Sequence, residues 1–166
     1  MKRISIMLIA IFALSITALL FIFLDKPKEY IFTSPPINAQ NWVTLYDGTD
    51  SCNEIYLNEN GDLVMVLTSE QKKDFLKYDI TTAGGISSTG TTLTFSNNYK
   101  TLEIVGEQGQ LNIESSIRTA IFNAQFNQVL RSGTSDWQLE VILKDRNTGS
   151  TLQTFFLPNE PFIWNY

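Results

Sequence analysis

The sequence predicts a mainly β protein with a minor helical part: an antiparallel β-sandwich or barrel-like domain with one short helix, preceded by a single N-terminal transmembrane helix. Three observations support this fold class. Residues 4–24 form an uninterrupted run of 21 uncharged, mostly apolar residues. Beyond residue 42, apolar residues mostly recur with a period of two, which is typical of strands buried on one face. Roughly seven to nine such runs alternate with turn-forming segments, as in sandwiches and barrels.

The apolar run 4–24 is long enough to cross a bilayer. As a helix it extends about 30 Å, the thickness of the hydrocarbon core. A cleavable signal peptide has a shorter apolar region of about 7–15 residues, followed by small residues at the cleavage site. Bulky and charged residues follow here, in LLFIFLDKPKE. We therefore expect an uncleaved signal anchor, and the alternative is a secreted β-domain released by cleavage.

The same pattern predicts the domain organisation and the location. Residues 1–3 form a short cytoplasmic N-terminus that carries Lys2 and Arg3, 4–24 span the membrane, 25–41 form a proline-containing linker, and 42–166 form an extracytoplasmic β-rich domain. The basic N-terminus favours this orientation, although Lys26 and Lys28 on the other side oppose it. We expect a single-pass protein of a bacterial cell membrane, with its domain in the periplasm or on the cell surface.

The first part of the domain contains one clear hairpin. NWVTLY (residues 41–46) alternates as a strand does, and DGTDS then supplies turn residues. Apolar runs at 54–57 and 62–68 flank Asn60-Gly61, a dipeptide that tolerates the positive φ angles of a hairpin turn. The sequence therefore predicts a β-hairpin over 54–68.

A short helix and further strands follow. Thr68 and Gln71 have the spacing of a capping box, which predicts a helix over 69–77. The Gly/Ser/Thr-rich run 81–92 favours a surface loop, since it lacks the lysine and helix of a phosphate-binding loop. Alternating apolar pairs then predict three strands, at 93–95, 102–104 and 111–113.

The segment 117–131 is ambiguous between strand and helix. Ala120, Phe122, Ala124 and Phe126 alternate with other residues, which favours a strand, whereas helical spacing gives two opposite apolar faces. We favour the strand. A closing hairpin is predicted from Trp137–Leu143 and Thr151–Leu157, and an aromatic tail follows.

Composition excludes several kinds of chemistry. The chain has no histidine and one cysteine, so a Ser-His-Asp triad, a Cys-His pair and an internal disulfide are impossible. Residues 25–166 carry all 17 acidic residues and 10 of the 12 basic ones, a net charge of −7. An acidic surface repels nucleic acid backbones, so we expect no nucleic acid partner.

Two groups of residues are candidates for a site. Asp47, Asp50 and Glu54 surround Cys52 and could offer oxygen ligands to calcium, although their spacing does not match an EF-hand and is equally typical of a plain turn. Phe162, Trp164 and Tyr166 of the tail either close the core or bind a partner. We expect no cofactor and no catalytic residue, and we expect Cys52 to be reduced and unpaired.

The leading functional hypothesis is therefore a non-enzymatic, membrane-anchored protein-interaction module, such as an assembly factor of an envelope complex or an immunity or inhibitor protein. Its expected partners are the lipid bilayer, through residues 4–24, and another protein. The alternative is an anchored envelope hydrolase with carboxylate or Ser/Lys chemistry, which requires two acids or a Ser-Lys pair in one concave pocket.

Overall fold

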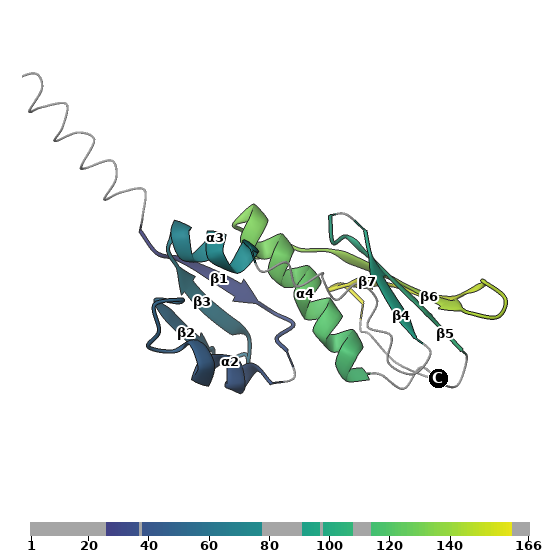
Figure 1. Cartoon of the computed structure of the whole chain (residues 1–166), viewed down its shortest axis with the longest axis horizontal. Helices are drawn as coiled ribbons and strands as arrows, with labels where there is room; N and C mark the ends of the chain where they lie inside the picture. Colours follow the sequence, from purple (N-terminus) through teal and green to yellow (C-terminus); the bar gives the residue numbers. More distant parts are fainter. Residues whose placement is uncertain (1–25, 37, 78–90, 97, 108–113, 161–166) are drawn as a thin grey trace, which may run out of the picture.

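The computed structural model describes residues 26–36, 38–77, 91–96, 98–107 and 114–160. In these ranges the chain forms a mixed α+β fold of seven strands in two sheets, together with three helices (Figure 1). Strands predominate, as the sequence predicts. The sheets do not close into a barrel, and the prediction of a single helix in the domain is wrong.

Several predicted features lie outside the described residues. They are the membrane segment 4–24, most of the loop 81–92, the strand at 111–113 and the tail residues Phe162, Trp164 and Tyr166. These features stay predictions. Among the helices that the structure does describe, none combines the length and apolarity of a membrane span.

The first sheet has the order β1-β3-β2, and all its pairs are antiparallel. Strand β3 (Leu63–Leu67) lies between β1 (Lys28–Phe32) and β2 (Glu54–Leu57), and four of its five residues are buried. The sequence places β1 in the extended linker 25–41, yet this segment pairs with β3 along its whole length. Tyr30 and Phe32 explain the difference, because both side chains are buried in the core.

The hairpin predicted over 54–68 is confirmed as β2 and β3. Gly61 adopts the positive φ of the turn, +82°, whereas Asn60 does not. The Asn58 side chain organises the loop, because its Oδ1 accepts hydrogen bonds from the backbone N–H groups of Asn60 and Asp62 at 3.0 and 2.9 Å. Turn chemistry therefore fixes this register locally.

The second sheet has the order β4-β5-β6-β7. Its strands are β4 (Thr92–Phe95), β5 (Thr101–Gly106), β6 (Leu139–Asp145) and β7 (Thr151–Leu157), and β5 and β6 are parallel. Buried and partly exposed residues alternate along β5 and β6, which leaves one face of the sheet for the core. The sequence predicts the positions of these four strands correctly, but the expected antiparallel arrangement is wrong for β5 and β6.

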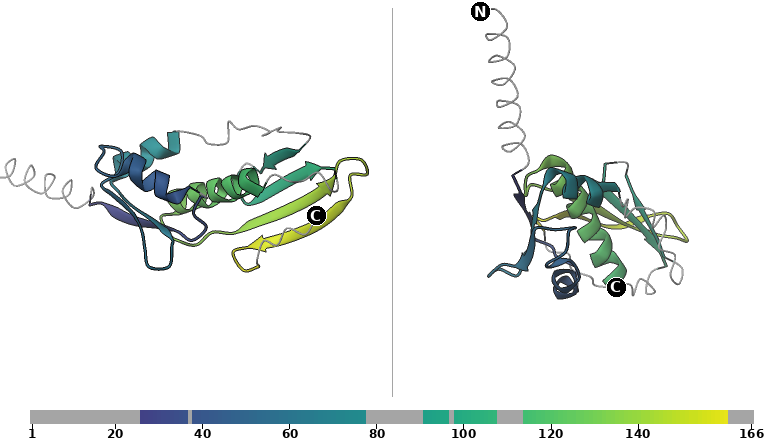
Figure 2. Two further views of the ribbon diagram at one scale, coloured as in Figure 1. Left: turned by 90° about the horizontal axis from the view of Figure 1, so that it is seen from below. Right: turned by 60° about the vertical axis from the view of Figure 1, so that its left-hand side comes forward.

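Helix α4 (Glu114–Ser132) connects the parallel strands β5 and β6 and lies between the two sheets (Figures 1 and 2). The strand predicted for 117–131 is therefore wrong. All eight residues from 120 to 127 are buried, so the middle of the helix has no solvent-exposed side. The sequence there therefore lacks the periodic polar face that marks an amphipathic helix. A parallel pair such as β5 and β6 also requires a crossover connection, which α4 provides.

Candidate functional site

Helix α2 (Ala39–Tyr46) occupies the segment in which the sequence predicts a strand. Ala39, Trp42, Val43 and Tyr46 have the i, i+3, i+4, i+7 spacing of a helical face, and all four side chains are buried or pack against the core. Gly48 follows with φ +69°, the conformation that commonly ends a helix. The spacing and this glycine are the signals that could have revealed the helix from sequence.

Helix α3 (Ser69–Lys77) begins where the sequence predicts it, with the predicted capping box. The Gln71 backbone N–H donates to Thr68 Oγ1 at 3.2 Å, and the Thr68 N–H donates to Gln71 Oε1 at 2.9 Å. Gln71 Nε2 also donates to the carbonyl oxygen of Asp50 at 2.9 Å. This side chain thus holds the start of α3 against the segment that follows α2.

A groove of about 630 Å³ opens between α2, the segment after it and α3. We call it the aromatic groove, and it is lined by Trp42, Tyr46, Asp50, Ser51, Gln71, Asp74 and Phe75. Its three aromatic residues are partly exposed, and they come from both helices. Its volume lies within the range of about 300–1,000 Å³ that is usual for ligand sites.

The rings of the aromatic groove are held by the core beneath them. Tyr46 lies between Trp42 and Phe75, with ring centroids 5.5 and 5.3 Å away. Trp42 and Phe75 each make an edge contact with buried Phe126, at 5.7 and 5.9 Å. Such contacts fix the orientation of the rings, so the groove is formed before any ligand arrives.

Two carboxylates lie among these rings. Asp50 is exposed, and Asp74 pairs with Lys77 at 2.6 Å on the surface of α3. The Asp74 and Lys77 side chains are 55% and 74% exposed, so water screens their attraction. An exposed pair of this kind contributes about 0–1 kcal/mol and opens readily. The groove thus offers apolar ring surface and negative charge together.

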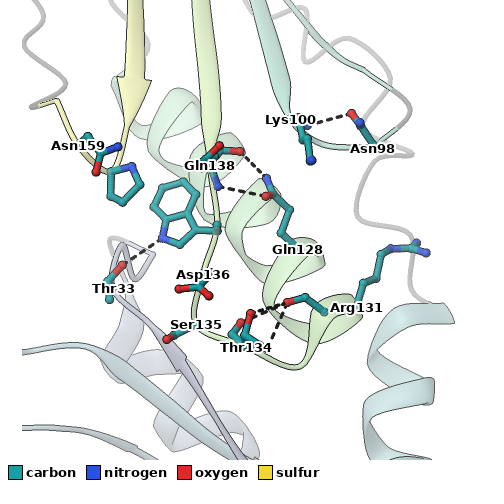
Figure 3. A pocket seen from close by; sticks show the side chains of 13 residues that line it. Thr33, Asn98, Lys100, Gln128, Arg131, Thr134, Ser135, Asp136, Gln138 and Asn159 are labelled. Carbon is teal, nitrogen blue, oxygen red and sulfur yellow. Dashed lines mark hydrogen bonds between the residues drawn. The ribbon is translucent and has the colours of Figure 1, made fainter.

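A second cavity, of about 710 Å³, lies where α4 ends and β6 begins. We call it the polar pocket (Figure 3). It is lined mainly by amide, hydroxyl and charged side chains from five parts of the chain: Thr33, Asn98, Lys100, Gln128, Arg131, Ser132, Thr134, Ser135, Asp136, Trp137, Gln138, Pro158 and Asn159.

The amides in and behind the polar pocket are engaged in holding the fold together. Gln128 Nε2 donates to the carbonyl oxygens of Tyr99 and Gln138 at 2.7 and 2.8 Å. The hydroxyl oxygen of Thr33, which also lines the pocket, accepts from Gln125 Nε2 at 3.0 Å and from Trp137 Nε1 at 3.2 Å. Figure 3 shows the bonds between Gln128 and Gln138 and the bond that Thr33 accepts. Trp137 is only 5% exposed, so its ring offers little surface to a ligand.

The polar pocket shows no pair of carboxylates among its described lining residues. Among the described residues, Asp136 is the one carboxylate that lines it, and the hydroxyl of Ser132 is engaged with backbone groups of Val129 and Thr134. The aromatic groove is therefore the stronger candidate site.

The structure describes all four residues that the sequence groups at Cys52. Asp47, Asp50 and Glu54 are exposed, and no cluster of three potential metal ligands occurs in the described ranges. Cys52 is buried, and its Sγ donates to the Glu54 carbonyl oxygen at 2.9 Å. Burial raises the pKa of the Cys52 thiol, and the charges of Asp47 and Glu54 add to this shift. Cys52 is thus a packed, protonated thiol.

Of the residues proposed from sequence that the structure describes, only Asp50 lines the aromatic groove. The sequence also contains Trp42, Tyr46 and Phe75, but reading residues 41–46 as a strand conceals that the first two share a helix face. Comparisons with protein-family models, curated proteins and solved structures find no match for the chain. The assignment of a site therefore depends on the geometry of the chain itself.

Proposed function

We propose that this chain is a membrane-anchored, non-enzymatic interaction module that binds a protein partner through the aromatic groove. Residues 4–24 hold it in the bilayer, with the N-terminus in the cytoplasm and the folded domain outside. The observation that supports the proposal most directly is the shared placement of Trp42, Tyr46 and Phe75 at one groove.

The chemistry of these side chains fits protein binding. Tryptophan and tyrosine are enriched among the residues that dominate binding energy at protein interfaces. They supply a large contact area with few rotatable bonds, so little conformational entropy is lost on binding. Because the rings also pack against the core, most of their freedom is already lost in the free protein.

Site-specific photo-crosslinking in native membranes tests the proposal. A benzoylphenylalanine placed at Ser51, in the groove, should give one discrete protein adduct, and Trp42→Ala should weaken it strongly. The matched control position is Thr148, an exposed residue of the turn between β6 and β7. A groove position that yields no adduct, or the same adducts as Thr148, would refute the proposed function.

The topology is tested separately. Full-length protein should stay with the membrane after alkaline carbonate extraction, and a protease added outside the cytoplasmic membrane should digest the domain. Replacement of Leu14 by arginine should reduce membrane retention, because a charged residue at the centre of a span costs about 2.5–3.5 kcal/mol in insertion. Release of the unmodified protein by carbonate would contradict the anchor.

A further inference from the structure

Resting on the proposed function, we infer that the aromatic groove recognises a cationic side chain, above all an arginine, on a segment of the partner protein. The groove combines the two kinds of group that hold a guanidinium. Trp42 and Tyr46 supply aromatic rings, and Asp50 and Asp74 supply carboxylates. Arginine stacks on aromatic rings and also forms bidentate pairs with carboxylates, so both kinds of group act on one side chain.

The protein already uses the same chemistry within its own fold. The Nζ atoms of Lys28 and Lys72 lie 6.0 and 5.7 Å from the centroid of the Tyr30 ring, within the range of cation–π attraction. Tyr30 thus has cations from its own chain. In the part of the chain that the structure describes, no cation lies over the rings of Trp42 and Tyr46, and we assign that cation to the partner.

The charges at the groove favour the same ligand. Both side chains of the Lys77–Asp74 ion pair are exposed, so a guanidinium can replace the Lys77 ammonium at little cost. Residues 25–166 carry a net charge of −7, so the field around the domain attracts a basic segment and repels an acidic one.

The size of the groove fits one long side chain together with part of the backbone that carries it. Its volume of about 630 Å³ exceeds the needs of a small cation alone. The aromatic rings line it from both helices, so a peptide lying across α2 and α3 contacts them while its arginine reaches the carboxylates. An extended basic segment is therefore the occupant that uses all parts of the groove.

Fluorine NMR of the full-length chain in detergent micelles, labelled with 5-fluorotryptophan, tests this inference. The resonance of Trp42 is identified by its loss in Trp42→Phe. The probe is the blocked peptide Gly-Arg-Gly-Arg-Gly, and the matched control peptide carries citrulline, which has nearly the same shape without the charge. We expect a saturable shift of the Trp42 resonance with the arginine peptide and an affinity for the citrulline peptide at least about 5-fold weaker.

Variants of the carboxylates provide the second test. The double variant Asp50→Asn/Asp74→Asn should bind the arginine peptide less tightly, by about 2- to 5-fold for each carboxylate removed. Its control is Glu59→Gln/Glu140→Gln, which changes the net charge equally at residues that do not line the groove. Thermal unfolding of both variants verifies that they fold.

The outcomes separate this inference from the proposed function. Equal binding of the two peptides, or equal weakening by the two double variants, would overturn recognition of a cation at the groove. A crosslink at Ser51 that persists under those results would leave the interaction module in place with a different ligand chemistry. Absence of the crosslink would instead refute the proposed function, whatever the peptides do.

Discussion

Gln125 links α4 to the end of β1 by two side-chain hydrogen bonds, and its replacement by leucine measures how much these bonds stabilise the fold. The side chain is 0% exposed. Its Oε1 accepts from the backbone N–H of Ser34 at 2.9 Å, and its Nε2 donates to Thr33 Oγ1. Leucine has a similar size, so the main loss is of hydrogen bonds rather than volume.

The expected cost follows from those two bonds. Each contributes about 1 kcal/mol net, and leaving the Ser34 N–H without an acceptor adds about 1 kcal/mol or more. We therefore expect Gln125→Leu to lower the free energy of unfolding by about 2–4 kcal/mol. Guanidinium unfolding of the full-length chain in micelles, followed by near-ultraviolet circular dichroism, measures this loss.

Two further variants make the measurement decisive. Gln40→Leu makes the same chemical change at an exposed position of α2, where surface substitutions usually alter stability by about 0.5 kcal/mol or less. Thr33→Val removes the shared partner, so its combination with Gln125→Leu should cost about 1 kcal/mol less than the sum of the single effects. If Gln125→Leu matched Gln40→Leu, the role assigned to these bonds would be wrong.

Three further predictions concern packing, the thiol and the hairpin turn. Phe126→Ala should lower the free energy of unfolding by about 3–5 kcal/mol because the ring is 1% exposed, whereas Phe156→Ala, at 51% exposure, should cost far less in the same unfolding assay. Cys52→Ser should lower the free energy of unfolding by about 1 kcal/mol or less, since a hydroxyl can also donate to the Glu54 carbonyl oxygen. Iodoacetamide should label wild-type Cys52 rapidly only after unfolding. Because burial raises the pKa of the folded thiol, wild-type stability should fall as the pH rises above the unfolded thiol's value of about 8.5, and denaturant unfolding of the serine variant should lack that fall. Gly61→Ala should cost about 1–2 kcal/mol in thermal unfolding, entirely from its φ of +82°, since an added Cβ meets no atom within 4 Å; a loss no larger than that of an exposed control such as Gln40→Ala would contradict this reasoning.

Sequence reasoning succeeds where local chemistry determines the structure. The Asn58–Asp62 turn and the Thr68–Gln71 capping box are each formed by side chains within a few residues, so their spacing predicts β2, β3 and α3. The second sheet is also predictable, because one face of β5 and β6 is partly exposed and keeps a period of two. In these elements, propensity, pattern and turn chemistry agree.

The errors have a shared physical cause, which is burial by elements distant in sequence. Helix α4 is covered on all sides through its middle, and Asn123, Gln125 and Asn127 are buried within it, so polarity does not mark an exposed face. Strand β1 is likewise stabilised by Leu63–Leu67, more than thirty residues away. Neither contact leaves a local signature.

Helix α2 shows how the same effect hides the candidate site. In residues 41–46, Trp42, Thr44 and Tyr46 alternate as in a strand, but Trp42 and Tyr46 are also one helical turn apart. In a strand, Trp42, Thr44 and Tyr46 would lie along one face with about 6.6 Å between successive side chains. The two rings would then pack against the core separately. In the helix the rings of Trp42 and Tyr46 contact each other, and Trp42 also packs against Phe122 and Phe126 of α4.

The packing that selects the helix therefore also builds the groove. Phe126 contacts both Trp42 and Phe75, so the two sides of the groove share one support in the core. It follows that loss of the Phe126 ring should weaken ligand binding as well as stability, although Phe126 does not line the groove. Gln125→Leu removes hydrogen bonds to Thr33 and Ser34, which do not line the groove. It should therefore lower stability without changing the affinity of the remaining folded protein for the arginine peptide. This difference in binding separates support of the groove from stability of the whole fold.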